Sequence, residues 1–254
     1  MEQGMRGDEI RAKKKLVEQW GQARAQLEQL RMFEVRPNDD FSRFCLNATS
    51  RDTPVIVFDV EPTTFLVPER ASDFRSLPNL YISARGRIAL NRAAIERQEL
   101  VTDSFATEVA YFRHKGTAAG RSVLEHVYAA HFDHAVDEIG HPIFHVQMQS
   151  YPERADELAR QYAIDGEVED RLAGVLKTVR IPTAQMDFFS FLVQICADHL
   201  IHKDSGPEDL QAFEGLREST KSIIGARHLL RAIAGADCTR GLHWYPMRSP
   251  HASA

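Results

Sequence analysis

Residues 124–148, LEHVYAAHFDHAVDEIGHPIFHVQM, are the stretch on which the predicted fold depends. Residues 144–148 alternate between apolar and polar side chains with the two-residue period of a β-strand. Residues 124–134 are a second candidate strand, and the Asp, Glu and Gly between the two segments favour a turn. Phe144, Val146 and Met148 share one face of the second strand. We therefore expect an antiparallel hairpin that pairs apolar with apolar and polar with polar side chains.

Further strands are expected on both sides of this hairpin. Val, Ile, Phe and Tyr are concentrated in short runs that are separated by turn residues. The central Arg85-Gly86-Arg87 of one run suggests a tight turn and hence a short hairpin. The predicted strand regions are residues 54–60, 80–90, 108–113 and 175–181, with Pro182 ending the last of them.

Helices are expected at the two ends of the chain. Residues 8–33 form an amphipathic pattern in which Leu16, Trp20 and Leu27 recur at helical spacing. We expect Thr183 to cap a helix over residues 184–203, and Pro207 to open another over residues 208–234, followed by a tail. The predicted regions are residues 8–33 (helix), 54–182 (mainly strands), 183–234 (helical) and 235–254 (tail).

This distribution of elements predicts the fold class. The strands cluster in the middle of the chain and the helices lie outside them, which favours an α+β fold over alternating βαβ units. We expect a single domain over residues 1–254, with a central antiparallel sheet flanked by N-terminal and C-terminal helices. The apolar face of helix 8–33 would pack on the domain itself or on a second subunit.

Composition narrows the functional classes. The net charge of −5 and the pI near 6.1 argue against a protein whose whole surface neutralises phosphates, although a local basic groove could still bind nucleic acid. Three scattered cysteines without a CxxC pair suit a reducing compartment. The most apolar stretch, residues 188–201, is too short and too polar to span a bilayer. We expect a cytoplasmic protein without membrane contact.

Five of the eleven histidines lie between positions 126 and 145. Strand alternation places His131 and Asp133 on one face of the first strand and His141 and His145 on the matching face of the second. His131, Asp133 and His145 have the composition of a divalent-metal site, and equally of a general base oriented by a carboxylate. The alternative is a polar strand face with ordinary hydrogen bonds. His126 and His134 are expected on the opposite face, with the aromatic side chains.

A second candidate segment follows at residues 180–187. Arg180 precedes and Asp187 follows the predicted junction between a strand and a helix. If this junction faces the histidines, Arg180 would bind an anion with help from the N-terminus of the helix. The candidate catalytic residues are therefore His131, Asp133, His141, His145, Arg180 and Asp187.

The two segments together resemble an uncharacterised bacterial family. The resemblance rests on residues 141–147 (HPIFHVQ), 180–183 (RIPT) and 186–188 (MDF), which match a pattern close to HPxxHxQ, RIP and a helix of apolar and acidic residues. It covers about residues 105–203. It implies a bacterial setting of the phage-defence type and carries no known activity.

Three functional hypotheses follow. The first is an interaction or regulatory subunit of a complex. It would contact a protein partner or a second copy through helix 8–33 and the tail. The second is a hydrolase of the nuclease or phosphodiesterase type that uses the His/Asp cluster, with or without a metal. The third is a sensor that binds a small ligand at the same His/Asp cluster and catalyses no reaction. The sequence slightly favours the first, because none of its catalytic patterns is specific.

Overall fold

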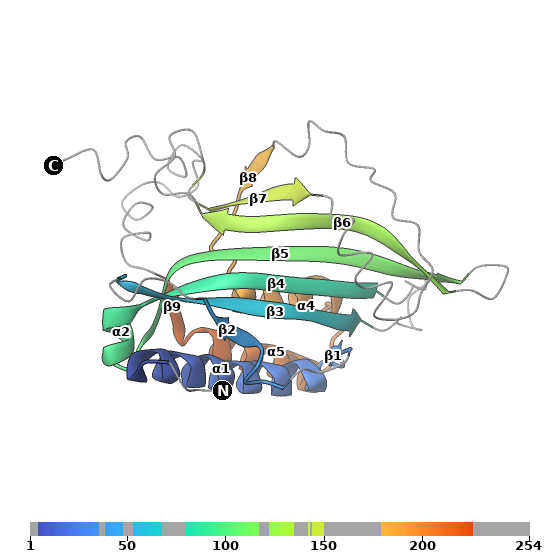
Figure 1. The fold of residues 1–254 in the computed structure, drawn as a ribbon. Coiled ribbons are helices and arrows are strands. Elements are labelled where there is room, and N and C mark those ends of the chain that lie inside the picture. Colours follow the sequence, from blue (N-terminus) through green and yellow to red (C-terminus); the bar gives the residue numbers. More distant parts are fainter. Residues whose placement is uncertain are drawn as a thin grey trace, which may run out of the picture.

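The structure is a computed structural model that describes residues 5–35, 39–47, 53–67, 80–116, 122–134, 142, 144–149 and 179–225. The described strands form one large sheet in the order β1-β3-β4-β5-β6-β7-β8, with β2 also beside β3 and β9 beside β5 (Figure 1). Their bounds are β1 Phe33–Glu34, β2 Phe44–Leu46, β3 Val55–Val67, β4 Leu80–Asn91, β5 Leu100–Gly116, β6 Ser122–His134, β7 Phe144–Gln149, β8 Arg180–Pro182 and β9 Ile223–Gly225. All pairs are antiparallel except β5–β9.

Helices cover one face of this sheet. They are α1 (Gly7–Gln29), α2 (Arg92–Glu96), α4 (Phe188–His199) and α5 (Pro207–Thr220). Figure 1 shows α4 and α5 behind the strands and α1 along the lower edge. The predicted α+β class, with an antiparallel sheet flanked by helices from both ends of the chain, is confirmed.

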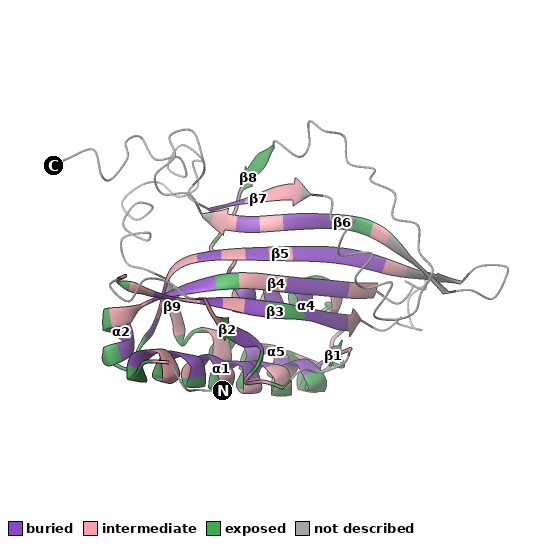
Figure 2. Ribbon diagram, viewed as in Figure 1, coloured by how far each residue is buried: buried purple, intermediate pink, exposed green. Residues whose placement is uncertain are grey.

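The core lies between α1, α4, α5 and the inner face of the sheet, by which we mean the face that these helices cover. Val109 and Phe132 from the sheet and Phe188 and Ile195 from α4 belong to one buried cluster. Figure 2 shows the corresponding buried stretches along β4, β5 and β6. The opposite side of the sheet is called the outer face below.

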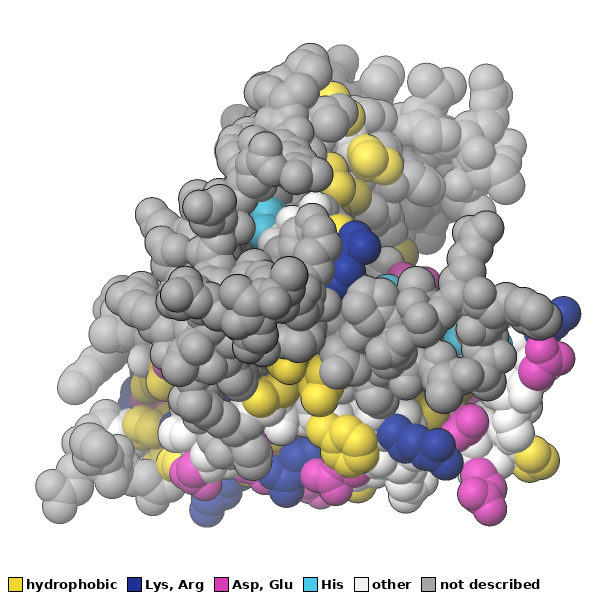
Figure 3. All heavy atoms as spheres, turned by 90° about the vertical axis from the view of Figure 1, so that its right-hand side faces the viewer, with side chains coloured by type: hydrophobic (Ala, Val, Ile, Leu, Met, Phe, Trp, Pro, Cys, Tyr) yellow, Lys and Arg dark blue, Asp and Glu magenta, His cyan; other side chains and the backbone are white. Residues whose placement is uncertain are grey.

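Helix α1 buries its apolar side against the rest of the described chain. Leu16, Trp20 and Leu27 are at most 1% exposed, and the Trp20 ring packs against Phe65 and Phe188. Figure 3 shows charged side chains of both signs in the lower part of the molecule, where α1 and α5 lie in Figure 1. Since the apolar side of α1 is already buried in its own fold, a partner on this helix would meet its charged side.

A buried arginine fastens α1 to the edge of the sheet. Arg43 is 0% exposed, and its Nη2 lies 2.5 Å from Glu34 Oε1. Its guanidinium carbon also lies 4.1 Å from the centre of the Trp20 ring. The charge is thus paired and stacked, as a buried guanidinium requires.

Helix α1 is shorter than predicted. The helix ends at Gln29 rather than at residue 33, and Arg31 has a positive φ of 62° that turns the chain. Phe33 then begins β1 and pairs with Leu66 of β3. The left-handed residue ends the helical hydrogen bonding although the sequence pattern continues past it.

The predicted hairpin at residues 80–90 is wrong, because this segment is the single strand β4. Gly86 lies in the interior of β4, where a Cβ would approach the backbone oxygen of Ala106 to 2.8 Å and the Phe188 Cβ to 3.8 Å. Glycine is therefore present because β5 and α4 approach closely, and not because the chain reverses.

Strand β3 also exceeds its prediction. It runs to Val67 and includes Pro62, where the register with β4 shifts between Val60 and Thr63. A proline has no N–H to donate to a ladder, and an irregularity of this kind accommodates it.

The predicted cap at Thr183 is wrong. The Thr183 N–H donates to Phe144 O at 3.0 Å, so this residue continues the pairing of β8 with β7. Asp187 caps α4 instead, with its carboxylate accepting from the N–H groups of Phe189 and Ser190. The helix then spans 188–199 and not 184–203.

The last predicted helix is correct at its start and wrong at its end. Pro207 is the first residue of α5, but α5 ends at Thr220 and not at residue 234. Ile223–Gly225 forms β9, which pairs with the start of β5. Residues 226–234 and the predicted tail, 235–254, lie outside the described residues. None of the helices in the described ranges is long and apolar enough to cross a membrane.

Candidate active site on the outer face of the sheet

A row of polar residues crosses five strands of the sheet. Arg85 pairs with Glu108, Glu108 with His131, His131 with Gln147, and Gln147 with Arg180. Residues directly opposite one another in antiparallel strands point to the same face, so all five lie on one side of the sheet. We call these five residues the polar row.

The polar row lies on the outer face. Its strand neighbours Val109, Ala130 and Phe132 belong to the core on the inner face, and side chains alternate along a strand. The adjacent row on the outer face runs from Arg87 through Ala106 and Asp133 to His145 and Pro182. The predicted hairpin of β6 and β7 therefore has the register that places His131, Asp133 and His145 together.

Asp133 lies between two histidines. Its Oδ2 is 3.1 Å from His131 Nε2, and its Oδ1 is 2.8 Å from His145 Nε2. Both contacts have ion-pair distances but lack the near-linear N–H···O geometry of a strong hydrogen bond. One carboxylate thus joins two imidazoles, one from its own strand and one from the neighbouring strand.

The three side chains differ in exposure. His145 is 2% exposed, whereas His131 and Asp133 are 24% and 35% exposed. His145 is therefore a buried support for Asp133, and Asp133 in turn orients a histidine that reaches the surface. This order of base, orienting carboxylate and buried support is typical of sites where a histidine transfers protons.

The environment changes the acidity of His131. Its contact with the Asp133 carboxylate raises the pKa of His131 above the ordinary 6.5, and the negative charges of Asp133 and Glu108 add to this effect. Burial and the positive charge of Arg85 lower the pKa, but they do not cancel the increase. His131 therefore holds its proton to a higher pH than a free imidazole does.

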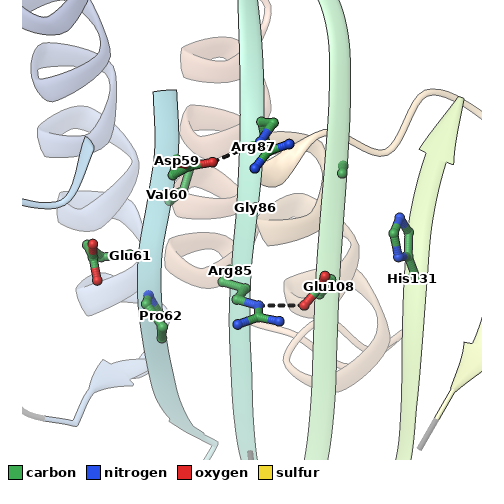
Figure 4. Close-up of a pocket in the computed structure, with 10 residues that line it drawn as sticks. Asp59, Val60, Glu61, Pro62, Arg85, Gly86, Arg87, Glu108 and His131 are labelled. Atoms are coloured by element: carbon green, nitrogen blue, oxygen red, sulfur yellow. Dashed lines mark hydrogen bonds and ion pairs between the residues drawn. The ribbon is translucent and has the colours of Figure 1, made fainter. Parts of the chain in front are cut away.

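A pocket of about 610 Å³ opens beside His131. This volume is within the range of small-ligand sites, roughly 300–1,000 Å³. Figure 4 shows that its side chains stand on β3, β4, β5 and β6, with the helices behind the sheet. Its lining consists of Asp59, Val60, Glu61, Pro62, Arg85, Gly86, Arg87, Ala106, Glu108 and His131.

Carboxylates hold both arginines of the pocket in place. Arg85 Nε lies 2.5 Å from Glu108 Oε2, and Arg87 Nε lies 2.8 Å from Asp59 Oδ1. Each of these contacts is made by Nε. The two Nη groups of a guanidinium form an edge that can bind an oxyanion in a bidentate manner. The arginines are 43% and 59% exposed, so a ligand in the pocket can reach them.

Arg180 and Asp187 are not brought together at the site. Arg180 lies exposed at the end of the polar row, on the same face as the histidines. Asp187 is 3% exposed, and its carboxylate accepts from two N–H groups of α4, from Ser190 Oγ and from Gln185 Nε2. The N-terminus of α4 therefore binds its own cap, and the prediction that it helps Arg180 to hold an anion is wrong.

The other histidines have separate outcomes. A register shift between Tyr111 and Phe112 pairs His126 with Phe112, which turns His126 to the outer face and corrects its predicted place. Its ring lies 5.4 Å from that of Phe112. His134 pairs with Phe144 through the backbone of β7. His141 lies outside the described residues.

The donors His131, Asp133 and His145 are of types that bind divalent metals. In the part of the chain that the structure describes, however, no group of three or more His, Cys, Asp or Glu side chains has the arrangement of a metal site. Both Nε2 atoms of the cluster face the oxygens of Asp133. The geometry fits a proton-transfer cluster better than a set of metal ligands.

The sequence prediction missed Arg85, Arg87 and Glu108. Alternation within a strand would have placed Arg85 and Arg87 on one face, two residues apart, if the glycine between them had not suggested a turn. Nothing local connects Glu108 to His131, since their contact arises from the pairing of β5 with β6.

Comparison with protein-family models, with curated proteins and with solved structures finds no match for this chain. The resemblance to a family with the HPxxHxQ and RIP patterns stays a prediction. The geometry of the site is therefore the basis for assigning a function.

Proposed function

We propose that the protein is a hydrolase of phosphodiester bonds in which His131 transfers the proton. The observation that carries this proposal is the order His145, Asp133, His131, from buried support to pocket wall, beside two arginines that carboxylates orient. Hydrolysis of a phosphodiester requires a general base to activate water and, beside it, a preorganised anion site to stabilise the negative charge of the transition state.

The proposed reaction uses the second nitrogen of His131. Since Nε2 faces Asp133, Nδ1 accepts a proton from a water molecule as the water oxygen attacks phosphorus. The P–O bond to the leaving group then breaks, and the protonated imidazole returns its proton to the departing oxygen. Arg85 and Arg87 offset the negative charge that develops on the phosphoryl oxygens.

The charges that line the pocket also restrict how the substrate can be recognised. Three carboxylates and two arginines line it together with His131, so the pocket as a whole is not strongly positive. The arginines therefore recognise a phosphodiester locally, as two directed donors rather than as a broad positive field. This agrees with the net charge of −5.

The test compares the full-length chain with variants on two substrates, bis(p-nitrophenyl) phosphate and a single-stranded oligonucleotide. We expect His131→Asn to lower kcat/KM by about 10²–10⁴-fold, the usual contribution of a general acid–base group. His202→Gln, which changes an exposed histidine outside the site, is the matched control and should stay within about twofold of wild type.

The assay includes arms with EDTA and with added Mg²⁺, Mn²⁺ or Zn²⁺, together with elemental analysis of the purified chain. Activity that survives EDTA supports the metal-free reaction. Activity that is lost in EDTA and returns only with one metal overturns the metal-free reaction and supports a metal-dependent one. No hydrolysis by the wild type in any arm, or equal rates for wild type and His131→Asn, would sink the proposal.

The interaction role stays a competing prediction. The sequence favours it because no catalytic pattern is specific, and its expected contact element is helix 8–33. The apolar side of this helix is buried against the described part of its own fold. A regulatory subunit or a ligand sensor predicts an inactive chain in every arm of the assay, so the same experiment separates these classes.

A further inference from the structure

We infer that the substrate is a short single-stranded oligonucleotide that lies across the strands, with phosphates held on both sides of His131. This inference rests on the proposed function and adds to it the substrate class and a second anion subsite at Arg180. The observation behind it is the order of the polar row, Arg85, Glu108, His131, Gln147, Arg180.

The register fixes the spacing of the two cationic positions. His131 stands two strands from Arg85 and two strands from Arg180. Neighbouring strands lie about 4.8 Å apart, so the backbone position of each arginine is about 10 Å from that of His131 along the row. A single phosphodiester at His131 is too small to bridge both arginines, whereas a strand with several phosphates reaches from one to the other.

The exposure of the two ends agrees with ligand contact. Arg85 is 43% exposed, and Arg180 is exposed at the end of the row. Ala106, on the outer face between Arg87 and Asp133, has a small side chain that leaves room above the sheet. A nucleotide chain can therefore approach His131 along the row from the arginine pair of the pocket.

The charge of the protein favours a short single strand over a duplex. A duplex carries closely spaced phosphates on both strands and needs many Lys and Arg contacts for stable binding. The net charge of −5 does not suit such a surface. A few phosphates on one strand need only the two cationic positions of the row.

Binding is measured separately from cleavage, by fluorescence anisotropy of thymidylate dinucleotide and hexanucleotide probes with phosphorothioate linkages that resist hydrolysis. We expect wild type to bind the hexanucleotide at least about tenfold more tightly than the dinucleotide, and Arg180→Gln to lose most of that gain. The slope of log Kd against log salt for the hexanucleotide should become shallower by about 0.7, the value for one phosphate contact on a single strand.

Arg97→Gln is the matched control. It removes the same charge from a side chain that is 62% exposed and that lies directly after α2, outside the polar row. We expect its Kd values and salt slope to stay within about twofold of wild type.

The outcomes separate this inference from the proposed function. Equal affinity for the two probes, or an unchanged Kd for the hexanucleotide in Arg180→Gln, overturns the inference, even if bis(p-nitrophenyl) phosphate is hydrolysed. Length-dependent binding that Arg180→Gln abolishes supports the inference, even if no substrate is cleaved and the hydrolase proposal fails.

Discussion

The two faces of strands β4, β5 and β6 differ in chemical character: one is apolar and the other is largely polar, although side chains of the same strands form both. On the inner face, Ile82, Val109 and Phe132 are part of the core under the helices. On the outer face, the polar row and the His131–Asp133–His145 cluster stand around a pocket. The inner face therefore stabilises the fold, and the outer face is free to bind and react.

The outer face is itself divided. Ala110, Phe112 and Ala129 are buried on it, whereas Arg85 and His131 remain accessible a few residues away along the same strands. The polar zone is thus supported on one side by a packed apolar zone. Such support keeps the geometry of a site within narrow limits.

The largest expected effect is in the core that lies between the helices and the inner face. Trp20→Ala should lower the free energy of unfolding by about 3–5 kcal/mol, because it empties a fully buried site and removes the ring beneath Arg43. Urea denaturation followed by circular dichroism measures this change. Leu210→Ala, at a position 45% exposed on α5, should change stability by less than about 0.5 kcal/mol. Similar losses in the two variants would contradict the assignment of the core.

A change in the cluster should affect activity more than stability. Asp133→Asn should lower kcat by about 10²-fold, because the carboxylate that orients His131 and stabilises its protonated form is lost. The pKa of His131 should fall, since Asp133 is the main cause of its increase. The acid side of the rate profile, where His131 must lose a proton to act as a base, should then move to lower pH. An unchanged profile would exclude His131 as the base.

A single methyl group on the inner face should have a clear cost. In Gly86→Ala, the new Cβ would lie 2.8 Å from the backbone oxygen of Ala106, so β4 and β5 must separate. We expect a loss of about 1–3 kcal/mol in unfolding free energy, as in other overpacked sites. Gly21→Ala in α1, where nothing lies within 4 Å, is the matched control and should stabilise the helix by about 0.5–1 kcal/mol. If Gly86→Ala stabilised the protein as much as Gly21→Ala does, the close approach at Gly86 would not be the reason for the glycine.

The smallest expected effect is the pH dependence of stability that His131 contributes. Its pKa is raised in the folded chain, so its contribution is fully present below the unfolded value near 6.5 and is lost as pH rises through the folded pKa. Unfolding free energies of wild type and His131→Gln, measured at several pH values, should therefore differ most in acid and converge in mildly alkaline solution. A difference that grows with pH would show that folding lowers the pKa of His131 instead of raising it.

Much of the site could be predicted from local alternation. His131 and Asp133 are two residues apart on β6, and His145 is on the matching face of β7, so period-two patterning was enough to group them. The same reasoning failed for His126, because the register shift between Tyr111 and Phe112 reverses the face of the residues beyond it. An irregularity of this kind depends on how two strands fit together and leaves little trace in one strand.

The misassigned elements have a common cause. The local preference of Gly86 predicts a turn, and that of Thr183 predicts a helix cap. In the structure, Gly86 meets the neighbouring strand and α4, and Thr183 donates to Phe144 of β7. Tertiary contacts determined both positions, and local preference did not.

The sequence by itself determined the fold class and the grouping of His131, Asp133 and His145, because side-chain period is a local property of the chain. Only the tertiary structure decided that β4 and β5 bring Arg85, Arg87 and Glu108 beside that group and that Asp187 belongs to α4. Pairing between distant strands sets those neighbours, and its register depends on the packing of the whole sheet against the helices.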